Sequence, residues 1–551
     1  MKRRAWLLDY FLPAVLVSAC LLQPFFFQGI IDPWETGAYL PFINQVLRGG
    51  ALFKDAVIFR GPLEIYLPVL MMKFTGAHIN TLHFCFYLGN LLSLVAAVFV
   101  AREVLKTRLF VYLLVPVMVA QSFSLVFYKN WGGWRHALGA GALWCILLFI
   151  RTRRRTALFC AGILSACGFF FSLEMGIIPF VAFLVALLLD ARYGREKNPH
   201  RLLAVFLQGA LVVAVPLTVY MLARGSLADY VKSLLVIPLS GHTIYRFDIL
   251  FPDVPHNPFQ AFRFLGKPFK PEFLYAMPLL VYIPLGLILC RNLLLRRMKA
   301  SSFTVIAAGA YGAAMYLGGF RQINGPQLLV SLPFAFIMLF FMLERLFMRF
   351  KERQSTQIVR TYGFVPLAVL ILLFTLSFSA IFAVKNFIAY GFDLERVVFR
   401  QISRGAFPSD THPLMLTTRR SHGVVVPGWQ AEEINGVVTY LIEHTASGEP
   451  VFGFPDLGTF NFLADRPCWS RFCQMDIASY RPEWTDGFFE RLDTQPPRVI
   501  VARRERDVFE PFLDEFPISM NRQRVRAFIE ERYVHRASFG GLTIYHLRDE
   551  E

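Results

Sequence analysis

The sequence has little charge for its length, and this scarcity excludes an ordinary soluble protein. Only 17% of its 551 residues are Asp, Glu, Lys or Arg, whereas 55% are hydrophobic. A soluble chain of this size carries about 25% charged residues. Acidic residues are the scarcer sign, so the formal net charge is +17. Such an excess can indicate nucleic acid as a partner. Here the basic residues cluster in short runs between long apolar segments, which is typical of a polytopic membrane protein and not of a nucleic-acid-binding one.

Two further absences concern metals and repeats. No His and Cys spacing of the metal-binding kind occurs, so the sequence predicts no such metal site and no other cofactor. No tandem repeat or low-complexity segment is found, whereas transporters often consist of repeated halves. Most of the cysteines fall in or near apolar segments, where we expect buried hydrophobic side chains. Cys468 and Cys473 lie elsewhere, and they would form a disulfide if their compartment is oxidising.

The apolar segments are long enough to cross a bilayer, which takes about 20 residues of helix. We expect about eleven crossings within residues 1–384. They lie near 7–28, 82–101, 109–127, 136–150, 156–172, 175–190, 202–223, 273–290, 302–320, 326–346 and 362–384. The predicted fold class is therefore mainly α. It is a polytopic bundle of transmembrane helices, followed by a C-terminal extracytoplasmic α/β domain at 385–551.

The loops between these segments alternate in charge. Alternate loops hold "MKRR", "RTRRR", "DARYGREKNPHR" and "RNLLLRRMK", and the others hold far fewer basic residues. The positive-inside rule then places the N-terminus in the cytoplasm, and an odd number of crossings places residues 385–551 outside. "VSAC", ending at Cys20, also resembles a lipoprotein cleavage site. Asp9 and Pro13 interrupt the apolar region, and hydrophobicity continues to Phe27, which favours an uncleaved helix.

Two external loops are long enough to hold structure of their own. In the first, 29–81, apolar residues recur at helical spacing from Tyr39 to Leu47. Pro62 follows Gly61 at a position typical of the first residue of a helix, so we expect two short helices on the membrane surface. The second loop, 224–272, is rich in Pro, His and aromatic residues and is expected to pack near the membrane. In the tail, "EEINGVVTYLIEHTA", the short "LGTFNFLA" and "NRQRVRAFIEERY" predict helices, whereas "EPVFGF", "PRVIVA" and "GGLTIYHL" predict strands.

The stretch "QGIIDPWETGAYLPF" places Asp32 and Glu35 directly after an apolar segment. Carboxylates at this depth are costly unless they are solvated or paired. By themselves they are also compatible with ordinary loop acids that cap the following helix.

The residues that follow resemble a known pattern. "ETGAY", "LRGGALFKD" and "FRGPLEIYL" resemble the first external loop of the GT-C superfamily, polytopic glycosyltransferases such as protein O-mannosyltransferases and lipid A aminoarabinose transferases. In this resemblance Glu35 falls on the family's acid, Tyr39 on its Tyr and Asp55 on its second acid, and Gly61 begins the counterpart of Pro-Pro-Leu. The family's leading acid is usually an Asp in an Asp-Glu pair. Asp32 therefore stays a candidate, although the spacing favours Glu35.

The resemblance extends beyond this loop. "RQINGPQLLVSLP", which begins at Arg321, is similar to the segment that opens a late crossing in these enzymes, although the usual His-Tyr pair is absent. The tail "GEPVFGFPDLGTFNFLADRPCWSRF" is similar to the external domain of bacterial members. The resemblance implies a multi-pass protein of a bacterial-type inner membrane. Its implied partners are a polyprenyl-phosphate sugar donor, membrane lipids and an envelope lipid, glycan or protein as acceptor.

The chemistry implied by the resemblance is transfer of a sugar with inversion. Glu35 or Asp32 would act as general base toward an acceptor hydroxyl. The departing phosphate needs cations, for which the external candidates are Arg60, Lys129, Arg135, His136, Arg246 and Arg321. Each of these is also compatible with an interfacial anchor. Some superfamily members use a divalent ion, which Asp32, Glu35 and Asp55 could share.

Several other residues are candidates for substrate contacts. Tyr39 is one by its place in the motif. Asp55 would either orient a substrate hydroxyl or brace its loop, and Glu174 would neutralise an arginine, bind the acceptor or only end a turn. His242, Tyr245, Asp248 and His256 are possible gating residues on the second loop.

Two other functions compete with sugar transfer. A lipid or solute transporter would place charges near the bilayer midplane, whereas here they concentrate in loops. A non-catalytic scaffold with the same fold is compatible with the altered acidic motif.

Overall fold

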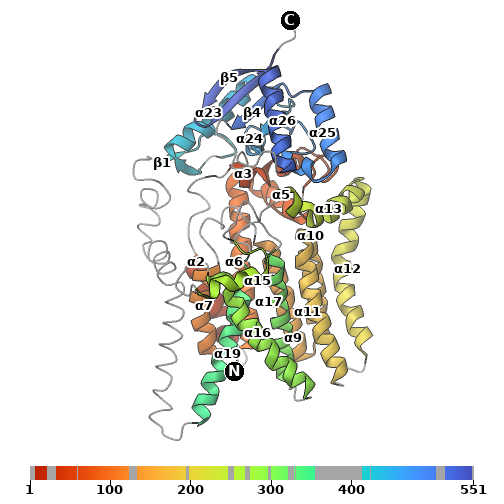
Figure 1. Ribbon diagram of the computed structural model, residues 1–551, viewed down its shortest axis with the longest axis vertical. Coiled ribbons are helices and arrows are strands. Elements are labelled where there is room, and N and C mark those ends of the chain that lie inside the picture. Colours follow the sequence, from red (N-terminus) through yellow and green to blue (C-terminus); the bar gives the residue numbers. More distant parts are fainter. Residues whose placement is uncertain are drawn as a thin grey trace.

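The computed structural model describes most of the chain and places an α/β domain on one end of a helical bundle (Figure 1). The described residues are 6–21, 31, 33–58, 60–122, 133–193, 198–245, 254–266, 273–295, 300–320, 328, 330–353, 413–421, 423–503 and 516–548.

Each crossing predicted up to residue 346 corresponds to a helix or helix pair in the structure. These are η1 (Leu7–Phe11) with α2 (Leu12–Leu21), α6 (Ile79–Val104), α7 (Arg108–Ser122), α9 (Trp134–Thr152), α10 (Arg155–Phe171), α11 (Leu173–Arg192), α12 (Pro199–Ala223), α16 (Phe273–Leu294), α17 (Ala300–Gly319) and α19 (Leu332–Arg353). The crossing predicted at 362–384 lies outside the described residues. The number of crossings therefore stays a prediction.

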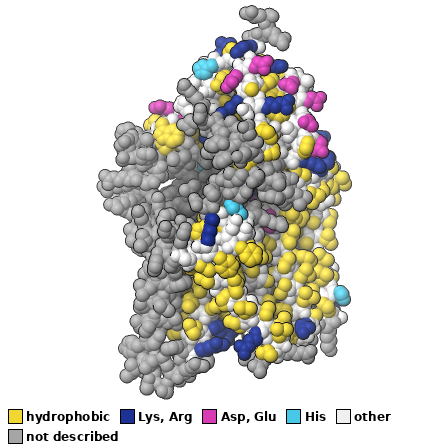
Figure 2. All heavy atoms as spheres, in the orientation of Figure 1, with side chains coloured by type: hydrophobic (Ala, Val, Ile, Leu, Met, Phe, Trp, Pro, Cys, Tyr) yellow, Lys and Arg dark blue, Asp and Glu magenta, His cyan; other side chains and the backbone are white. Residues whose placement is uncertain are grey.

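The outer surface of the bundle is apolar, as contact with lipid requires. Four of the described helices, α6, α11, α12 and α16, are each long and apolar enough to cross a membrane. The most apolar window of α12 has a mean hydropathy of 2.3, yet only 17% of it is buried inside the protein. Figure 2 shows the same property as a broad band of hydrophobic side chains over the bundle. Exposing so large an apolar surface to water would be unfavourable, so the bundle is embedded in a membrane.

Helices inside the bundle approach closely where glycines face each other. A side chain at Gly162 of α10 would meet the carbonyl oxygen of Phe206 at 2.0 Å, and one at Gly209 of α12 would meet that of Phe159 at 2.0 Å. Small residues let membrane helices pack backbone to backbone, because apolar lipid supplies little force to drive them together.

The end of the bundle opposite the α/β domain holds ion pairs between largely buried acids and partly exposed arginines. Asp9 forms an ion pair with Arg102 at 2.9 Å, Glu103 pairs with Arg151 at 2.9 Å, and Asp190 accepts from Arg153 at 2.8 Å. The acids neutralise part of the basic clusters that the sequence places in alternate loops. Basic side chains accordingly gather along this edge in Figure 2.

The first loop forms three short helices that lie between the bundle and the α/β domain. They are α3 (Pro33–Gly37), α4 (Leu40–Leu47) and α5 (Leu63–Thr75), so both helices expected here exist. Their expected position on the membrane surface is wrong for α4, because Leu40–Asn44 are buried and Asn44 donates to two carbonyls of the α/β domain.

The second loop contains more helix than its composition indicated. We expected 224–272 to be a long external loop packed near the membrane and predicted no helix in it, whereas α13 spans Leu227–Tyr245, followed by α15 (Pro258–Ala261) and η3 (Phe262–Gly266). Tyr230 explains part of the difference. Its ring is buried, and the ring centroid lies 4.9 Å from that of Phe53 and 6.1 Å from that of Phe170. These contacts anchor the first turns of α13 on the first loop and on α10.

The α/β domain contains a four-stranded sheet in the order β3-β4-β6-β5. β3 (Val451–Phe454) and β4 (Val499–Arg503) are parallel, whereas β6 (Leu542–Leu547) pairs antiparallel with β4 and with β5 (Tyr533–Phe539). The predicted helices and strands all exist, including α23 (Gly428–His444), α24 (Thr459–Leu463) and α26 (Pro517–Arg532). The sequence prediction lacked α25 (Pro482–Thr494), β5, η5 (Met475–Tyr480) and the separate pair β1 (Pro413–Met415) and β2 (Val425–Pro427).

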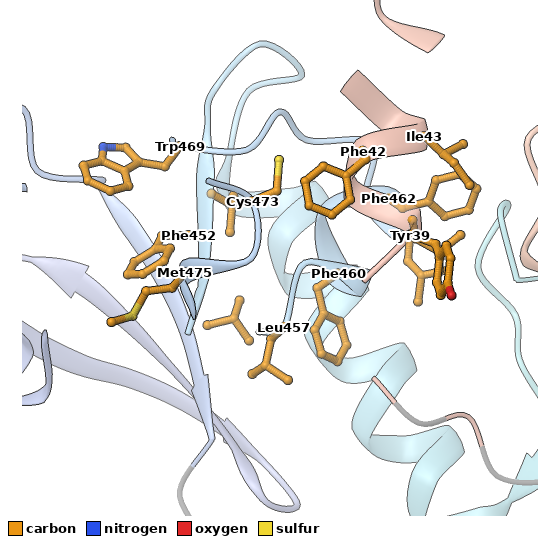
Figure 3. Close-up of a cluster of buried hydrophobic side chains, with 14 of the residues drawn as sticks. Tyr39, Phe42, Ile43, Phe452, Leu457, Phe460, Phe462, Trp469, Cys473 and Met475 are labelled. Atoms are coloured by element: carbon orange, nitrogen blue, oxygen red, sulfur yellow. The ribbon is translucent and has the colours of Figure 1, made fainter. Parts of the chain in front are cut away.

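The first loop and the α/β domain share one hydrophobic core. Figure 3 shows Phe42 and Ile43 of α4 facing Phe460 and Phe462 of α24. Hydrogen bonds flank these contacts: Asn44 Nδ2 donates to the carbonyls of Asn461 at 3.2 Å and Arg466 at 2.8 Å. The two segments are separated by hundreds of residues in the chain but fold as one unit.

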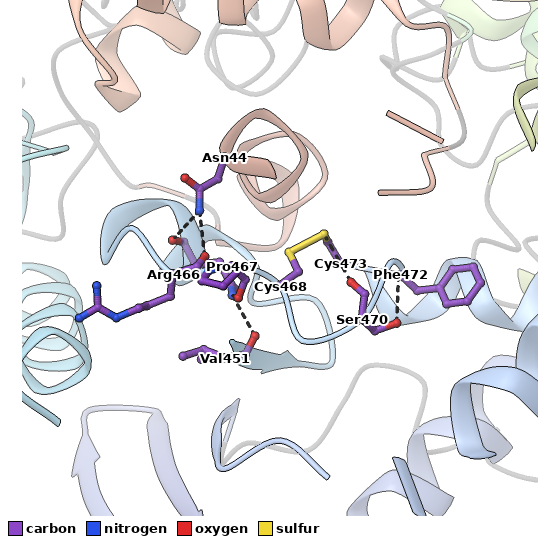
Figure 4. The surroundings of a disulfide bond; sticks show 9 residues. Asn44, Val451, Arg466, Pro467, Cys468, Ser470, Phe472 and Cys473 are labelled. Carbon is purple, nitrogen blue, oxygen red and sulfur yellow. Dashed lines mark hydrogen bonds between the residues drawn. A yellow bond between two sulfur atoms is a disulfide. The ribbon is translucent and has the colours of Figure 1, made fainter. Parts of the chain in front are cut away.

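A disulfide closes the loop of the α/β domain that contacts the first loop. Cys468 and Cys473 are bonded, with their Cα atoms 5.5 Å apart, close to Asn44 and Arg466 (Figure 4). Between the two cysteines, the carbonyl of Arg471 accepts from Val57 N at 2.8 Å, and Arg471 Nη2 donates to the carbonyl of Phe53 at 2.7 Å. The disulfide therefore stabilises a docking loop.

Candidate active site

The two acids proposed as general base, Asp32 and Glu35, are largely outside the described structure. Asp32 lies outside the described residues. The backbone of Glu35 lies in α3, beneath the α/β domain, but its side chain is outside the described part. The choice between these two acids as general base stays a prediction.

Next to α3, a buried cluster joins Tyr39, Arg60 and Glu64. Glu64 Oε1 accepts from Arg60 Nη1 at 2.8 Å and from Tyr39 Oη at 3.5 Å. The guanidinium of Arg60 lies over the Tyr39 ring, 5.4 Å from its centroid. Tyr39 and Arg60 were predicted as substrate contacts, and the structure brings them together.

The backbone at Gly61 holds this cluster in place. Its N–H donates to the carbonyl of Phe171 at 3.0 Å, and a side chain there would meet the carbonyl oxygen of Phe170 at 2.0 Å. Only glycine fits between the first loop and the end of α10. Pro62 then leads into α5, which places Glu64 in its first turn, one helical turn after Arg60.

A second cation, Arg135, lies at the mouth of the bundle. It is 6% exposed in the first turn of α9, where its Nη1 is 3.6 Å from Glu174 Oε1 and its Nε donates to His136 Nε2 at 3.2 Å. Arg135 also interacts electrostatically with Arg60 and Glu64, so the two clusters are one electrostatic unit. Glu174 thus neutralises an arginine, which was one of its three predicted roles.

The position of Arg135 is electrostatically unusual. The N-terminus of a helix carries a partial positive charge, which favours anions and disfavours cations. Glu174 lies in the first turn of α11, where this charge stabilises its carboxylate, whereas Arg135 lies in the first turn of α9, where the same charge repels its guanidinium. A buried cation at the start of α9 therefore adds to an existing positive potential, and this combination would attract an anion such as a phosphate.

A small cavity lies between the first loop and the α/β domain. Its polar lining consists of Tyr39, Arg60, Glu64 and Gln474, and its apolar lining includes Ile477. Its volume is about 10 Å³, the space of one water molecule. Gln474 directly follows the disulfide, so the docking loop supplies one wall of the site.

Two other predicted residues that the structure describes, Asp55 and His256, lie outside this cluster. Asp55 is exposed and accepts a hydrogen bond from Ala51 N at 2.7 Å. This bond lies within the loop, as expected if Asp55 braces it. His256 lies in the turn before α15, where its N–H donates to Gln260 Oε1 at 2.7 Å. Outside the described part of the chain lie Lys129, Arg246, Asp248 and Arg321, together with the side chains of His242 and Tyr245.

Sequence reasoning missed Glu64 and Gln474. A signal existed for Glu64, because an acid inside the apolar run "LEIYLPVL" needs a partner once it is buried, and Arg60 precedes it by four residues. No comparable signal marks Gln474, which reaches the cavity only through the docking of the two segments.

A metal ion is not assigned to this site. Among the described residues no group of three or more His, Cys, Asp or Glu side chains could hold one. Asp32 and the Glu35 side chain fall outside that search, and the exposed Asp55 braces its own loop, so no step is derived through a metal.

Comparison with solved structures shows the fold of the whole chain. No protein-family model matches the sequence, and no curated relative does. The structure of ArnT from Cupriavidus metallidurans bound to undecaprenyl phosphate matches 98% of this chain and 97% of its own, with a TM-score of 0.51 and 12% identity. An Archaeoglobus fulgidus oligosaccharyltransferase tethered to an acceptor peptide matches 99% of this chain and 74% of its own, with a TM-score of 0.56 and 13% identity. This chain has the GT-C fold.

A third solved structure matches over nearly the whole chain as well. The archaeal oligosaccharyltransferase AglB in complex with dolichol phosphate is a further match, with a TM-score of 0.54 and 13% identity over 99% of this chain. At such low identity the similarity concerns the fold alone. The resemblance seen in the first loop is therefore confirmed for the architecture, whereas the roles of individual residues rest on the geometry described above.

Proposed function

We propose that this protein is a membrane glycosyltransferase that transfers a sugar from a polyprenyl-phosphate-linked donor to an extracytoplasmic acceptor. The acceptor is an envelope lipid, glycan or protein. Two features support the proposal. The GT-C fold extends over nearly the whole chain and is shared with a structure that contains undecaprenyl phosphate. The junction between bundle and α/β domain also holds two neighbouring arginines at the mouth of the bundle.

The observation that carries the proposal is the buried Arg135 at the start of α9, next to Arg60. A lipid phosphate enters from the membrane with its headgroup at this level, and a guanidinium can bind it through two parallel hydrogen bonds. Part of each arginine's charge is offset, for Arg60 by Glu64 and for Arg135 by Glu174. The offset lowers the electrostatic cost of holding two cations close together, and a phosphate would offset the remaining positive charge.

The reaction requires a base and a leaving group on opposite sides of the sugar. The acceptor hydroxyl oxygen forms a bond to the anomeric carbon while the bond from that carbon to the phosphate oxygen breaks. The electron pair leaves with the phosphate, near Arg60 and Arg135, and the hydroxyl proton passes to Glu35 or Asp32. A single displacement of this kind inverts the anomeric carbon. The protein would lie in a bacterial-type inner membrane, with its N-terminus in the cytoplasm and its α/β domain outside.

Transfer assays with the purified full-length protein test the proposal. Wild type is incubated with undecaprenyl-phosphate hexoses and pentoses and with membrane extracts as a source of acceptor. Glu35→Gln and Asp32→Asn are compared with the exposed control Glu432→Gln. We expect transfer by wild type and by the control, and a loss of about 10²-fold or more in one of the two acid variants.

Each alternative function has a distinct result in the same experiment. A scaffold would bind the lipid phosphate without transferring sugar, and a transporter reconstituted in vesicles would move substrate across the membrane without cleaving it. Full transfer by both acid variants would contradict the carboxylate base.

A further inference from the structure

Two buried polar atoms at the junction lack a hydrogen-bond partner although they line the same cavity. Glu64 is 3% exposed and Gln474 is 2% exposed. Arg60 and Tyr39 both contact Oε1 of Glu64, whereas Glu64 Oε2 and Gln474 Oε1 have no partner. The first comes from α5 and the second from the loop before η5, and both side chains border the cavity described above.

Such atoms are costly in a folded protein. Buried polar atoms nearly always find a partner, and a carboxylate oxygen without one loses the hydration that it had in the unfolded chain. Two of them at one cavity indicate a place that a hydrogen-bonding ligand completes. Arg60 and Tyr39 are already bound to the other oxygen of Glu64, so they leave Oε2 available.

We propose that Glu64 and Gln474 form a subsite that recognises one hydroxyl group of the sugar carried by the lipid donor. This inference rests on the proposed function and adds which group of the donor the site recognises, a sugar hydroxyl. The hydroxyl donates its proton to Glu64 Oε2. The Gln474 amide, whose oxygen and nitrogen can exchange places by rotation, then donates to the hydroxyl oxygen.

The size and charge of the cavity define the ligand group. A volume of about 10 Å³ is the space of one water-sized group, which matches a single hydroxyl. An anion would also be repelled by the free carboxylate oxygen. The phosphate belongs instead near Arg60 and Arg135, and because the sugar is covalently attached to it, a sugar hydroxyl lies within reach of Glu64.

The subsite exists only when the α/β domain is docked. Gln474 directly follows Cys473 of the disulfide, and the same loop binds the first loop through Arg471. Recognition of the sugar is therefore shared between the first loop, which supplies Glu64, and the α/β domain, which supplies Gln474. The disulfide restrains the position of Gln474.

The test separates recognition of the sugar from binding of the lipid phosphate. Full-length protein in nanodiscs is titrated by native mass spectrometry with undecaprenyl phosphate and with a panel of undecaprenyl-phosphate hexoses and pentoses. The measured quantity is the ratio of the two affinities for the sugar that wild type binds most tightly. The variants are Glu64→Gln and Gln474→Leu, with Glu443→Gln and Gln495→Leu as exposed controls.

We expect wild type and both controls to bind the sugar-bearing lipid about tenfold more tightly than the plain lipid phosphate. In both subsite variants the ratio should fall toward one, while plain undecaprenyl phosphate is bound at least as tightly as by wild type, since neither variant removes an arginine. Two variants on different segments keep the test informative if one of them fails to fold.

Three outcomes would overturn the inference. If both variants keep the wild-type ratio while wild type binds both lipids, the subsite assignment is wrong and the proposed function stands. The assignment is also wrong if wild type binds the plain lipid phosphate but gains nothing from any sugar. If wild type binds neither lipid, the proposed function fails and this inference fails with it.

Discussion

At the scale of single residues, the site consists of charges that offset one another. Arg60 is paired with Glu64, and Arg135 with Glu174, and in each pair one member is buried and the other is partly exposed. Removing one member of a buried pair leaves the other uncompensated. Substitutions here must therefore be tested for ligand binding as well as for folding.

Arg135 provides a direct prediction. Arg135→Gln should weaken binding of undecaprenyl phosphate about tenfold or more, because a buried charge-assisted contact is lost. Arg135→Lys should recover part of the affinity, since an ammonium keeps the charge but not the two-point geometry. Native mass spectrometry measures both, with Arg345→Gln on the exposed surface of α19 as the control. Equal affinities for Arg135→Gln and the control would show that Arg135 does not face the phosphate.

His546 predicts a pH dependence of stability. Burial, together with Arg536, Arg498 and His444, lowers its pKa below 6.5, although Glu449 opposes the shift, and its Nε2 lies 3.2 Å from Tyr440 Oη. The unfolded chain then binds the proton more readily, so stability is full above about pH 6.5 and falls as the pH drops below it. Thermal midpoints between pH 8 and 5 should decline in wild type and decline less in His546→Gln. Parallel curves would assign the decline to other groups.

At the scale of elements, close glycine contacts decide how the membrane helices pack. α10 and α12 touch at Gly162 and Gly209, where the helix backbones leave no room for a side chain. α16 differs, because a side chain at Gly286 would meet nothing within 4 Å.

This difference predicts unequal effects of the same substitution. Gly162→Val should force α10 and α12 apart and lower stability by about 1–3 kcal/mol, whereas Gly286→Val should leave it nearly unchanged. Thermal unfolding of both variants in one detergent measures the difference. A midpoint for Gly162→Val that matches the Gly286→Val value would mean that the two helices are not packed as described.

At the scale of the whole molecule, docking joins the first loop to the α/β domain. Asn44 is central, because it donates to Asn461 and Arg466 and accepts from Arg420 Nη1 at 2.7 Å. Further bonds include Thr36 Oγ1 to Thr459 Oγ1 at 2.7 Å.

Asn44→Leu should loosen this interface. The substitution leaves several buried polar groups without partners, at a total cost of about 3 kcal/mol or more. We expect faster hydrogen exchange in α24 and in the docking loop, and weaker recognition of the sugar because Gln474 is displaced. Gln45→Leu, on the same helix, is the control. If the two variants exchange alike, Asn44 does not hold the interface.

Local patterns predicted much of this architecture. The apolar runs predicted the helices of the bundle up to residue 346, and short segments rich in strand-forming apolar residues predicted strands β3, β4 and β6. Both signals are local, since they depend on the spacing of apolar residues within one element. The helix α13 escaped prediction because Pro and His in its sequence indicated a loop, whereas packing of Tyr230 against Phe53 stabilises it.

The residues of the candidate site also fall into those that the sequence predicted and those that it did not. Tyr39, Arg60 and Arg135 could be proposed from the sequence because each stands in or near a short motif or at the mouth of an apolar segment. Glu64 carried a weak local signal in its spacing from Arg60, and Gln474 carried none. The base, Glu35 or Asp32, stays a prediction.

The sequence by itself determined that the chain is a membrane-embedded helical bundle with a separate α/β tail, because hydrophobicity and periodicity are properties of contiguous residues. Only the tertiary structure decided that the first loop and the tail share a core and that Glu64 meets Gln474 at one cavity. The two residues are about 400 positions apart, and such a contact depends on long-range packing that no local pattern encodes.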